Sequence, residues 1–357
     1  MSTYLPGLNG IRAIAAVTVI LAHTTLALGT FGLKDNIFGY LRNGELRNLD
    51  FAGFGVSIFF VLSGFLITFL LLKEKSYTGI SIKKFYWRRI LRIWPLYYFY
   101  FVLVLICLYI FSVQYSLAHI PFYIFLSANL AFALNQTIPY LIHYWSLGVE
   151  EQFYIFWPFL CRIKNSFLFK VIIFIISFLI GLKIILHVWF PGSFLENLIH
   201  INRFHCMLIG GAAAILFLNN NSLFFTISTA KFTQFLAWFV YFLAMTNQFH
   251  IVSFLDNEII SVFTVFIIMG QITKTSFISL EKSWLNFVGK ISFGLYVYHP
   301  LLIYLLSKFV VFKEDLVVNY LFIYSLIISL TISISWISHT YLESYFLGIK
   351  EARYSNR

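Results

Sequence analysis

Residues 53–72 read GFGVSIFFVLSGFLITFLLL, a run of 20 residues without a charge. A basic connection follows, KEKSYTGISIKKFYWRRILR (73–92), and then a second apolar run, IWPLYYFYFVLVLICLYIFS (93–112). A helix needs about 20 predominantly apolar residues to cross the hydrocarbon core of a bilayer. These segments predict two membrane-spanning helices joined by a basic connection.

The composition of the whole chain agrees with this prediction. Of its 357 residues, 60% are hydrophobic and only 11% are charged, and the mean hydropathy is +0.85. An average globular domain carries about 25% charged residues, so the chain has too little polar surface to cover a large soluble core. The composition excludes a soluble enzyme, a disordered protein and a secreted disulfide scaffold.

We therefore predict an all-α, polytopic membrane protein with about ten transmembrane helices. The predicted spans are 8–31, 53–72, 93–112, 145–161, 171–190, 202–218, 233–250, 259–274, 291–307 and 316–342. The apolar segment 121–135 is short, and we expect it to be re-entrant or interfacial. Residues 1–342 form one transmembrane domain in this prediction, and 343–357 form a short cytoplasmic tail.

The distribution of charge predicts the orientation. If the N-terminus is cytoplasmic and 121–135 does not cross, 17 of the 25 Lys and Arg residues lie on the cytoplasmic side. This bias follows the positive-inside rule, so we predict that both termini are cytoplasmic. The net charge of +11 does not indicate nucleic-acid binding, because its densest cluster lies between two spans. The three cysteines stand singly in apolar runs, which indicates no metal site.

Two ionisable residues of the first span, Arg12 and His23, share one face of the predicted helix. They lie about 20° apart around the helix and about 16 Å apart along it. A charge at mid-membrane costs about 2.5–3.5 kcal/mol even on lenient scales, which makes each a functional candidate. The alternative is a snorkelling arginine and a hydrogen-bonded core histidine.

Glu150 and Glu151 are adjacent within the fourth span, so one of them can face a cavity while the other points about 100° away. A carboxylate that faces His23 would orient its ring and stabilise the imidazolium. The alternative is a pair of acids solvated at the membrane edge.

Arg88, Arg89 and Arg92 follow one another at i, i+1 and i+4, which places Arg88 and Arg92 on one helical face. Such a cluster suits a polyanionic phosphate, although a positive-inside anchor has the same pattern.

Earlier in the chain, within the predicted span 53–72, Gly55 and Gly64 are expected to let helices approach closely.

Two further groups of polar residues lie in later spans. Arg203 begins the sixth span, where we expect a carboxylate or a substrate as its partner. Ser292, Tyr296 and His299 recur at i, i+4 and i+7 on one stripe of the ninth span, which also fits simple interhelical hydrogen bonding. Signatures of nucleotide hydrolysis, metalloprotease and sugar-nucleotide chemistry are absent from the sequence.

Taken together, these residues resemble the acyltransferase-3 family of integral membrane acyltransferases. Beside Arg12 and His23, the matching pieces occur in order along nearly the whole chain. They are GVSIFFVLSGFLI (55–67), WRRILRIWPLYY (87–98), WSLGVEEQFYIFWP (145–158), RFHCMLIGG (203–211) and FVGKISFGLYVYHPLL (287–302).

The resemblance implies an enzyme that moves an acyl group, usually acetyl, from cytoplasmic acyl-coenzyme A to a hydroxyl of an envelope glycan. The position of His23 matches the essential catalytic residue of the family, and Arg12 matches its basic partner. The arginines that match Arg88 and Arg92 are associated with coenzyme A. Some members carry a C-terminal SGNH domain, which we do not expect here, and this favours a stand-alone modifier of the bacterial inner membrane.

These inferences assign expected roles. The catalytic candidates are His23, Arg12 and Glu150, with His23 as base or acyl relay and Glu150 holding its tautomer. Coenzyme A binding is expected at Arg88, Arg89, Arg92 and Arg12. Acceptor binding or oxyanion stabilisation is expected at Arg203, Tyr296, His299, Glu151 and Ser146.

We expect acetyl-coenzyme A as co-substrate and no permanently bound cofactor or metal. The expected acceptor is an envelope polysaccharide or lipid-linked glycan, with lipopolysaccharide O-antigen foremost, and the segments 32–52 and 113–144 are expected to shape its site. Direct transfer and an acyl-histidine relay both remain open, and Ser63 or Ser146 are further possible acyl carriers. The competing class is a transporter of a lipid-linked or small anionic substrate, because buried Arg, Glu and His also mark permeation pathways.

Overall fold

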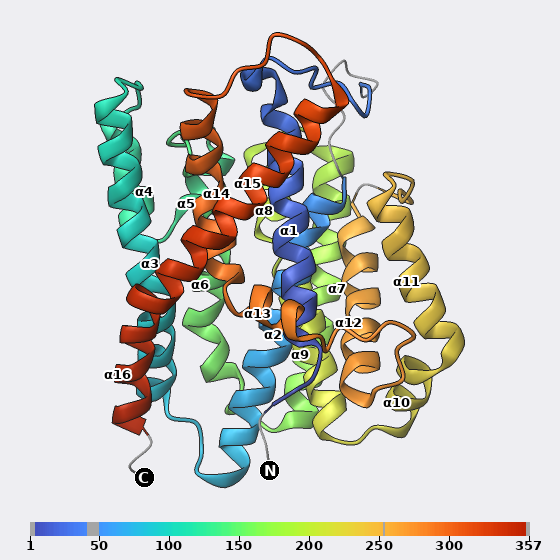
Figure 1. The fold of residues 1–357 in the computed structure, drawn as a ribbon. Helices are drawn as coiled ribbons and strands as arrows, with labels where there is room; N and C mark the ends of the chain where they lie inside the picture. The colour runs from blue at the N-terminus through green and yellow to red at the C-terminus, as the bar shows by residue number, and fades with distance from the viewer. Residues whose placement is uncertain (1–3, 41–49, 253, 355–357) are drawn as a thin grey trace.

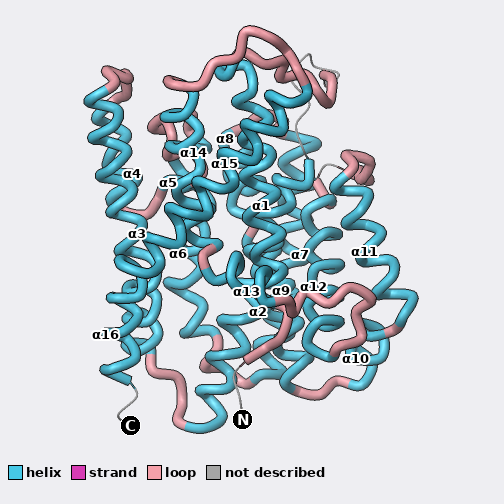
Figure 2. The backbone as a smooth tube through the Cα atoms, in the orientation of Figure 1, coloured by secondary structure: helices cyan, strands magenta, loops and turns pink. Residues whose placement is uncertain are grey.

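The computed structural model describes residues 4–40, 50–252 and 254–354. Within these ranges every regular element is a helix, which confirms the all-α prediction (Figure 1, Figure 2). The expected contribution of 32–52 to the acceptor site falls partly on residues 41–49, which lie outside the described residues.

Among the described residues, seven helical segments are long and apolar enough to cross a membrane. Four of them are single helices: α2 (Asp50–Tyr77), α3 (Ile82–Ile110), α7 (Asn165–Trp189) and α12 (Asp256–Thr273). The others are composite. They comprise α1 (Leu8–Ala27) with a 3-10 turn to Phe31, α8 (Phe194–Asn202) with α9 (Phe204–Leu218), and α15 (Val317–Ser338) continued through a π-helical turn (His339–Glu343) into α16 (Ser344–Tyr354).

The remaining predicted spans correspond to shorter or bent helices. The pair α10 (Ser222–Thr229) and α11 (Lys231–Met245) makes one apolar segment bent by 57°. The other two are α6 (Tyr144–Leu160) and α14 (Ser292–Ser307), the latter preceded by α13 (Ser283–Lys290). Each of the ten predicted ranges therefore falls on a helix, although only seven satisfy a strict length criterion.

Segment 121–135 contains no helix long enough to cross. It folds into α4 (Ile120–Ile124) and α5 (Ala128–Ala133), in agreement with the expectation that it does not cross. The expected boundary between transmembrane domain and tail, at 342/343, falls inside the π-helical turn. There the chain continues as α16, which lies beside α3 (Figure 1).

Helix α1 lies near the centre of the bundle, with α2, α13 and α14 around it (Figure 1). Helices α2 and α9 pack backbone to backbone through two glycines. A Cβ atom on Gly64 would lie 1.9 Å from the carbonyl oxygen of Met207, and one on Gly210 would lie 2.1 Å from that of Val61. Such small-residue contacts are how helices approach closely in a membrane, as expected for Gly64. Gly55 instead faces α1.

The first and last described residues lie at the same end of the bundle, the lower end in Figure 1. The basic connection between α2 and α3 lies at this end too. We call it the basic end. Its placement in the cytoplasm stays a prediction from the charge distribution.

Candidate active site

Two adjoining cavities hold most of the predicted site residues. The first, of about 290 Å³, is lined by Arg12, Arg89, Arg92 and Glu150, and we call it the arginine cavity. The second, of about 800 Å³, is lined by His23, His143 and Arg203, and we call it the histidine cavity. Val56 and Tyr296 line both cavities, so these two side chains form the wall between them.

Three cationic side chains and one carboxylate give the arginine cavity its chemistry. Arg12 comes from α1, and Arg89 and Arg92 lie one turn apart on α3. The carboxylate of Glu150 accepts a hydrogen bond from the Tyr154 hydroxyl at 3.2 Å. With three guanidinium groups against one carboxylate, the cavity favours an anionic ligand.

Arg88 lies outside this cavity, unlike its expected partner Arg92. Its guanidinium forms an ion pair with Glu74 at 2.7 Å. The i, i+4 spacing correctly indicates shared faces on a helix, but it does not say which face of α3 turns inward. In the structure the i, i+3 pair Arg89 and Arg92 turns inward. The guanidinium of Arg89 also lies over the ring of Tyr154, at 5.6 Å.

In the histidine cavity, His23 contacts a second histidine. Its Nδ1 atom lies 2.6 Å from Nε2 of His299, and the two rings stack with centroids 4.9 Å apart. His299 Nδ1 lies 3.1 Å from the carbonyl oxygen of Leu295.

This chain of contacts fixes the tautomers of both neutral rings. A carbonyl oxygen only accepts hydrogen bonds, so His299 carries its proton on Nδ1 and its Nε2 accepts. His23 must then donate from Nδ1, which leaves its Nε2 as a free lone pair. A neutral imidazole with an unprotonated Nε2 and a fixed Nδ1–H has the arrangement of a general base.

Glu150 therefore does not hold the tautomer of His23 as expected. It lines the arginine cavity, and His299 occupies the position at Nδ1 of His23. The pairing was expected because a carboxylate can orient a histidine ring, but the contact depends on how α1, α6 and α14 pack, which spacing along one helix does not determine. Arg12 and His23 likewise line different cavities rather than one groove.

Hydrogen bonds to α6 hold Tyr296, the α14 side chain of the wall between the cavities. The Tyr296 hydroxyl donates to the carbonyl oxygen of His143 at 2.9 Å, and it lies 2.7 Å from the hydroxyl of Ser146. Because its proton is used by a backbone carbonyl, Tyr296 is less suited to stabilise an oxyanion than expected. Its stripe neighbour Ser292 lines the arginine cavity, while His299 reaches His23.

Arg203 lines the histidine cavity, and its guanidinium donates to a backbone carbonyl and a hydroxyl rather than to the expected carboxylate. It joins α8 to α9 with a positive φ of 40°, a conformation that is uncommon outside glycine. Its Nη1 donates to the carbonyl oxygen of Gly53 at 2.9 Å and to the Ser57 hydroxyl at 3.1 Å. Glu151, by contrast, lines neither cavity and accepts from the indole N–H of Trp94 on α3 at 3.3 Å.

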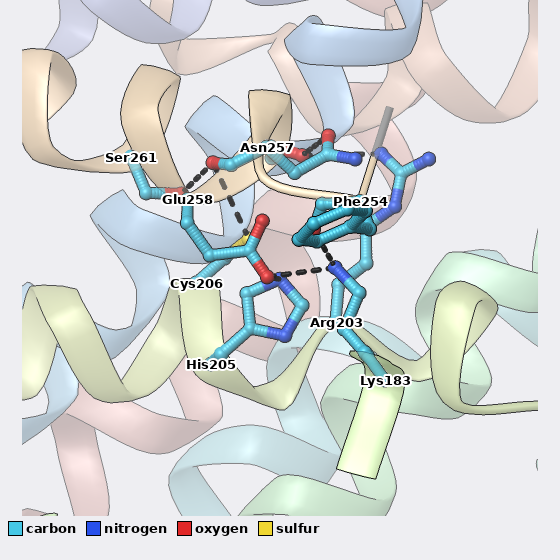
Figure 3. Close-up of polar contacts among 9 residues, drawn as sticks. Lys183, Arg203, His205, Cys206, Phe254, Asn257, Glu258 and Ser261 are labelled. Atoms are coloured by element: carbon cyan, nitrogen blue, oxygen red, sulfur yellow. Dashed lines mark hydrogen bonds and ion pairs between the residues drawn. The ribbon is translucent and has the colours of Figure 1, made fainter. Parts of the chain in front are cut away.

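A buried ion pair lies close behind Arg203 (Figure 3). The ammonium of Lys183 on α7 contacts Glu258 on α12 at 2.7 Å and the carbonyl oxygen of Phe254 at 2.6 Å. His205 Nε2 lies 3.3 Å from the same carboxylate. Both charges are almost fully buried, and a buried charge persists only when it is paired.

A chain of hydrogen bonds runs from Arg203, in the histidine cavity, to the residue next to Glu258. Asn257, next to Glu258, accepts from the Ser57 hydroxyl at 2.8 Å, and Ser57 accepts from Arg203. Arg203 is thus held directly by α2 and, through the Ser57 hydroxyl, by Asn257 of α12. Glu258 was missed by sequence reasoning because it precedes the predicted span 259–274, and His143 was missed because it precedes 145–161.

The segment 113–144 lines the histidine cavity with Phe132, Thr137, Pro139, Tyr140, Ile142 and His143. Across the described residues there is no group of three or more His, Cys, Asp or Glu side chains arranged to hold a metal ion.

Comparison with known proteins gives the class. A family model described as an acyltransferase domain matches residues 5–340, so the chain belongs to the acyltransferase-3 family of membrane proteins.

The curated relatives include a protein of Staphylococcus aureus (strain COL) named "Putative O-acetyltransferase", 28% identical over 97% of this chain and 58% of the relative. The O-acetyltransferase OatA of Staphylococcus aureus (strain NCTC 8325 / PS 47) is 26% identical over 96% of this chain and 57% of the relative. The chain thus spans little more than half the length of these relatives. No solved structure matches it.

Proposed function

We propose that this protein transfers an acetyl group from acetyl-coenzyme A to a hydroxyl of an envelope glycan. The observation that carries the proposal is the pair of adjoining cavities. One presents three guanidinium groups, the other presents a histidine with a free Nε2 lone pair, and they meet at Tyr296. The names of the Staphylococcus aureus relatives support acetyl as the group transferred.

The donor is assigned to the arginine cavity. Coenzyme A carries several phosphates, and Arg12, Arg89 and Arg92 offer forked donors that match phosphate oxygens. This cavity lies towards the basic end, which the positive-inside rule places in the cytoplasm. The pantetheine arm runs towards Val56 and Tyr296, the two side chains that line both cavities, so that its acetyl end reaches the histidine cavity beside them.

The chemistry is assigned to His23. Its Nε2 accepts the proton of the acceptor hydroxyl while the hydroxyl oxygen forms a bond to the thioester carbonyl carbon. The C–S bond then breaks, and the thiolate of coenzyme A takes the proton from the imidazolium. His299 supports this cycle because it keeps the proton of His23 on Nδ1. Direct transfer needs no covalent enzyme intermediate, so we favour it over an acyl-histidine relay.

The acceptor is assigned to the histidine cavity. At about 800 Å³ this cavity has the size of small-molecule sites in general. Arg203 lines it with a hydrogen-bonding group, and the guanidinium lies over the ring of Trp145, which also lines the cavity. We propose a glycan hydroxyl at the outer face of the bacterial inner membrane, with lipopolysaccharide O-antigen as the first acceptor to test.

The test is transfer of a labelled acetyl group. Purified protein in detergent is incubated with [¹⁴C-acetyl]-coenzyme A and an envelope polysaccharide extract. We expect label in the glycan, release of one free thiol per acetyl, and loss of the label in mild base, as for an ester. Coenzyme A that stays intact while the protein moves it or another anion across a vesicle membrane would instead identify a transporter.

A further inference from the structure

One buried imidazole in the histidine cavity makes no well-formed hydrogen bond in the described part of the chain. The side chain of His143 is only 3% exposed, and neither of its ring nitrogens makes a hydrogen bond of normal geometry, although the ring lies near enough to the backbone of Val297 for a weak contact. Its neighbours His23 and His299 are partnered by each other and by Leu295. A buried polar group without a hydrogen bond is unfavourable, so this ring is arranged to bond to a ligand.

His143 lies close to the place where the proposed mechanism puts the acyl group. Its ring centroid lies 5.6 Å from that of His299 and 5.4 Å from that of Tyr296. It therefore lies beside His299, which orients His23, and beside the wall past which the thioester enters. Its own carbonyl oxygen receives the Tyr296 hydroxyl, which fixes the backbone of His143 to that wall.

The local helix adds a favourable field. His143 is the N-cap residue of α6, a helix of 17 residues. The N-terminus of a helix carries a partial positive charge that favours negative charge nearby. Both the free imidazole and the helix end are thus suited to an oxygen on which negative charge develops.

We propose that His143 donates its imidazole N–H to the carbonyl oxygen of the acyl group during transfer. This inference rests on the proposed function and adds the oxyanion donor that the mechanism lacks. A neutral imidazole always carries one N–H, and a neutral histidine is known to polarise a substrate carbonyl in this way.

Throughout the reaction His143 keeps its proton. As the acceptor oxygen adds to the carbonyl carbon, the carbonyl electron pair moves onto oxygen and the hydrogen bond from His143 strengthens. When the C–S bond breaks, that pair re-forms the carbonyl of the new ester. Proton transfer belongs to His23 alone, which distinguishes the two histidines.

The experiment compares His143→Phe, which keeps a planar ring without a donor, with His143→Gln, which keeps an N–H donor. His250→Asn is the matched control, because His250 is an exposed histidine paired with Asp256 and lies in neither cavity. Acetyl transfer to the glycan is measured as kcat and KM for each substrate, and acetyl-coenzyme A binding is measured by calorimetry.

Removing one oxyanion donor costs about 10²–10³ in kcat. We expect a fall of that size in His143→Phe with acetyl-coenzyme A affinity within about twofold of wild type, and a partial recovery in His143→Gln. Equal kcat in wild type and His143→Phe overturns the inference, as does a loss confined to KM. A wild-type protein that transfers no acetyl group refutes the proposed function instead, so the two failures are distinguishable.

If neither variant of His143 purifies as a folded protein, the wild type provides the test. The infrared stretch of a ¹³C-labelled thioester carbonyl is recorded in the complex with acetyl-coenzyme A, with Arg203→Met, which carries no N–H donor, as a second sample. A lowered frequency in both supports a donor other than Arg203 at the carbonyl, and an unshifted frequency in either sample overturns the inference.

Discussion

The Nδ1 atom of His23 lies 2.6 Å from the Nε2 atom of His299, across the contact between α1 and α14. Because His299 itself donates to the carbonyl oxygen of Leu295, it accepts from His23 and leaves the other nitrogen of His23 free. A residue from the ninth predicted span, and not the expected glutamate, thus sets the protonation pattern of the proposed base.

His299→Phe is expected to lower kcat for acetyl transfer by about 10²-fold, within the range for a mispositioned general base. Affinity for acetyl-coenzyme A is expected to stay unchanged, since His299 does not line the arginine cavity. The measurement is steady-state transfer with calorimetric binding in parallel. A kcat within twofold of wild type would mean that His299 does not orient His23.

Arg89→Ala and Arg92→Ala are each expected to weaken acetyl-coenzyme A binding by about 10- to 100-fold, since a hydrogen bond to a charged group contributes about 1.5–3 kcal/mol. Arg88→Ala is the matched control, because the neighbouring arginine pairs with Glu74 outside the cavity. Calorimetric titration of the three variants checks this. An equal loss in Arg88→Ala would show that the ligand also contacts the outer face of α3.

Gly210→Ala is expected to destabilise the bundle by about 1–3 kcal/mol, the usual cost of overpacking. The added methyl group would lie 2.1 Å from the carbonyl oxygen of Val61, a backbone atom that cannot move without separating α2 from α9. Gly181→Ala on α7 is the control, since nothing lies within 4 Å of its added Cβ. Thermal melting in detergent should rank Gly210→Ala clearly below wild type and Gly181→Ala at or above it.

The segment before α1 is expected to loosen in acid. Although burial alone raises the pKa of Glu281, hydrogen bonds from Tyr4, the Gly7 amide and Asn286 hold it below its usual value. The pKa of Glu281 in the folded protein thus lies below its pKa in the unfolded chain. The ionised carboxylate therefore stabilises the contact with the segment before α1 above about pH 4.3, and this stabilisation is lost as the pH falls through the folded-state pKa.

Hydrogen exchange of the Gly7 amide reports this contact. Its protection, relative to an amide inside α1, should decrease at acidic pH in wild type and should already be low at neutral pH in Glu281→Gln. Protection that is the same in both proteins at every pH would contradict the assignment.

The helices were predictable because each apolar run is long and bounded by polar residues. All ten predicted ranges fall on helices, and Gly64 packs against α9 as its spacing suggested. The short segment 121–135 was correctly separated from the spans because its 15 residues cannot reach across a bilayer as a helix.

Partners between helices were not predictable in the same way. The sequence places Glu150 and His23 in two spans but does not say how those spans are rotated against each other, and in the structure they face different cavities. Arg88 and Arg89 differ by one position, so only packing decides which of them turns inward. His143 and Glu258 stand just outside the predicted spans, where a polar residue is unremarkable until its burial is known.

The central claim is that His23 performs acyl transfer to an acceptor while the donor is bound by other residues. The most direct test measures both properties in one protein, comparing wild type with His23→Ala for acetyl-coenzyme A affinity and for transfer of label to the glycan. We predict that His23→Ala binds acetyl-coenzyme A with wild-type affinity and transfers no label above background. Transfer by His23→Ala at the wild-type rate would contradict the account.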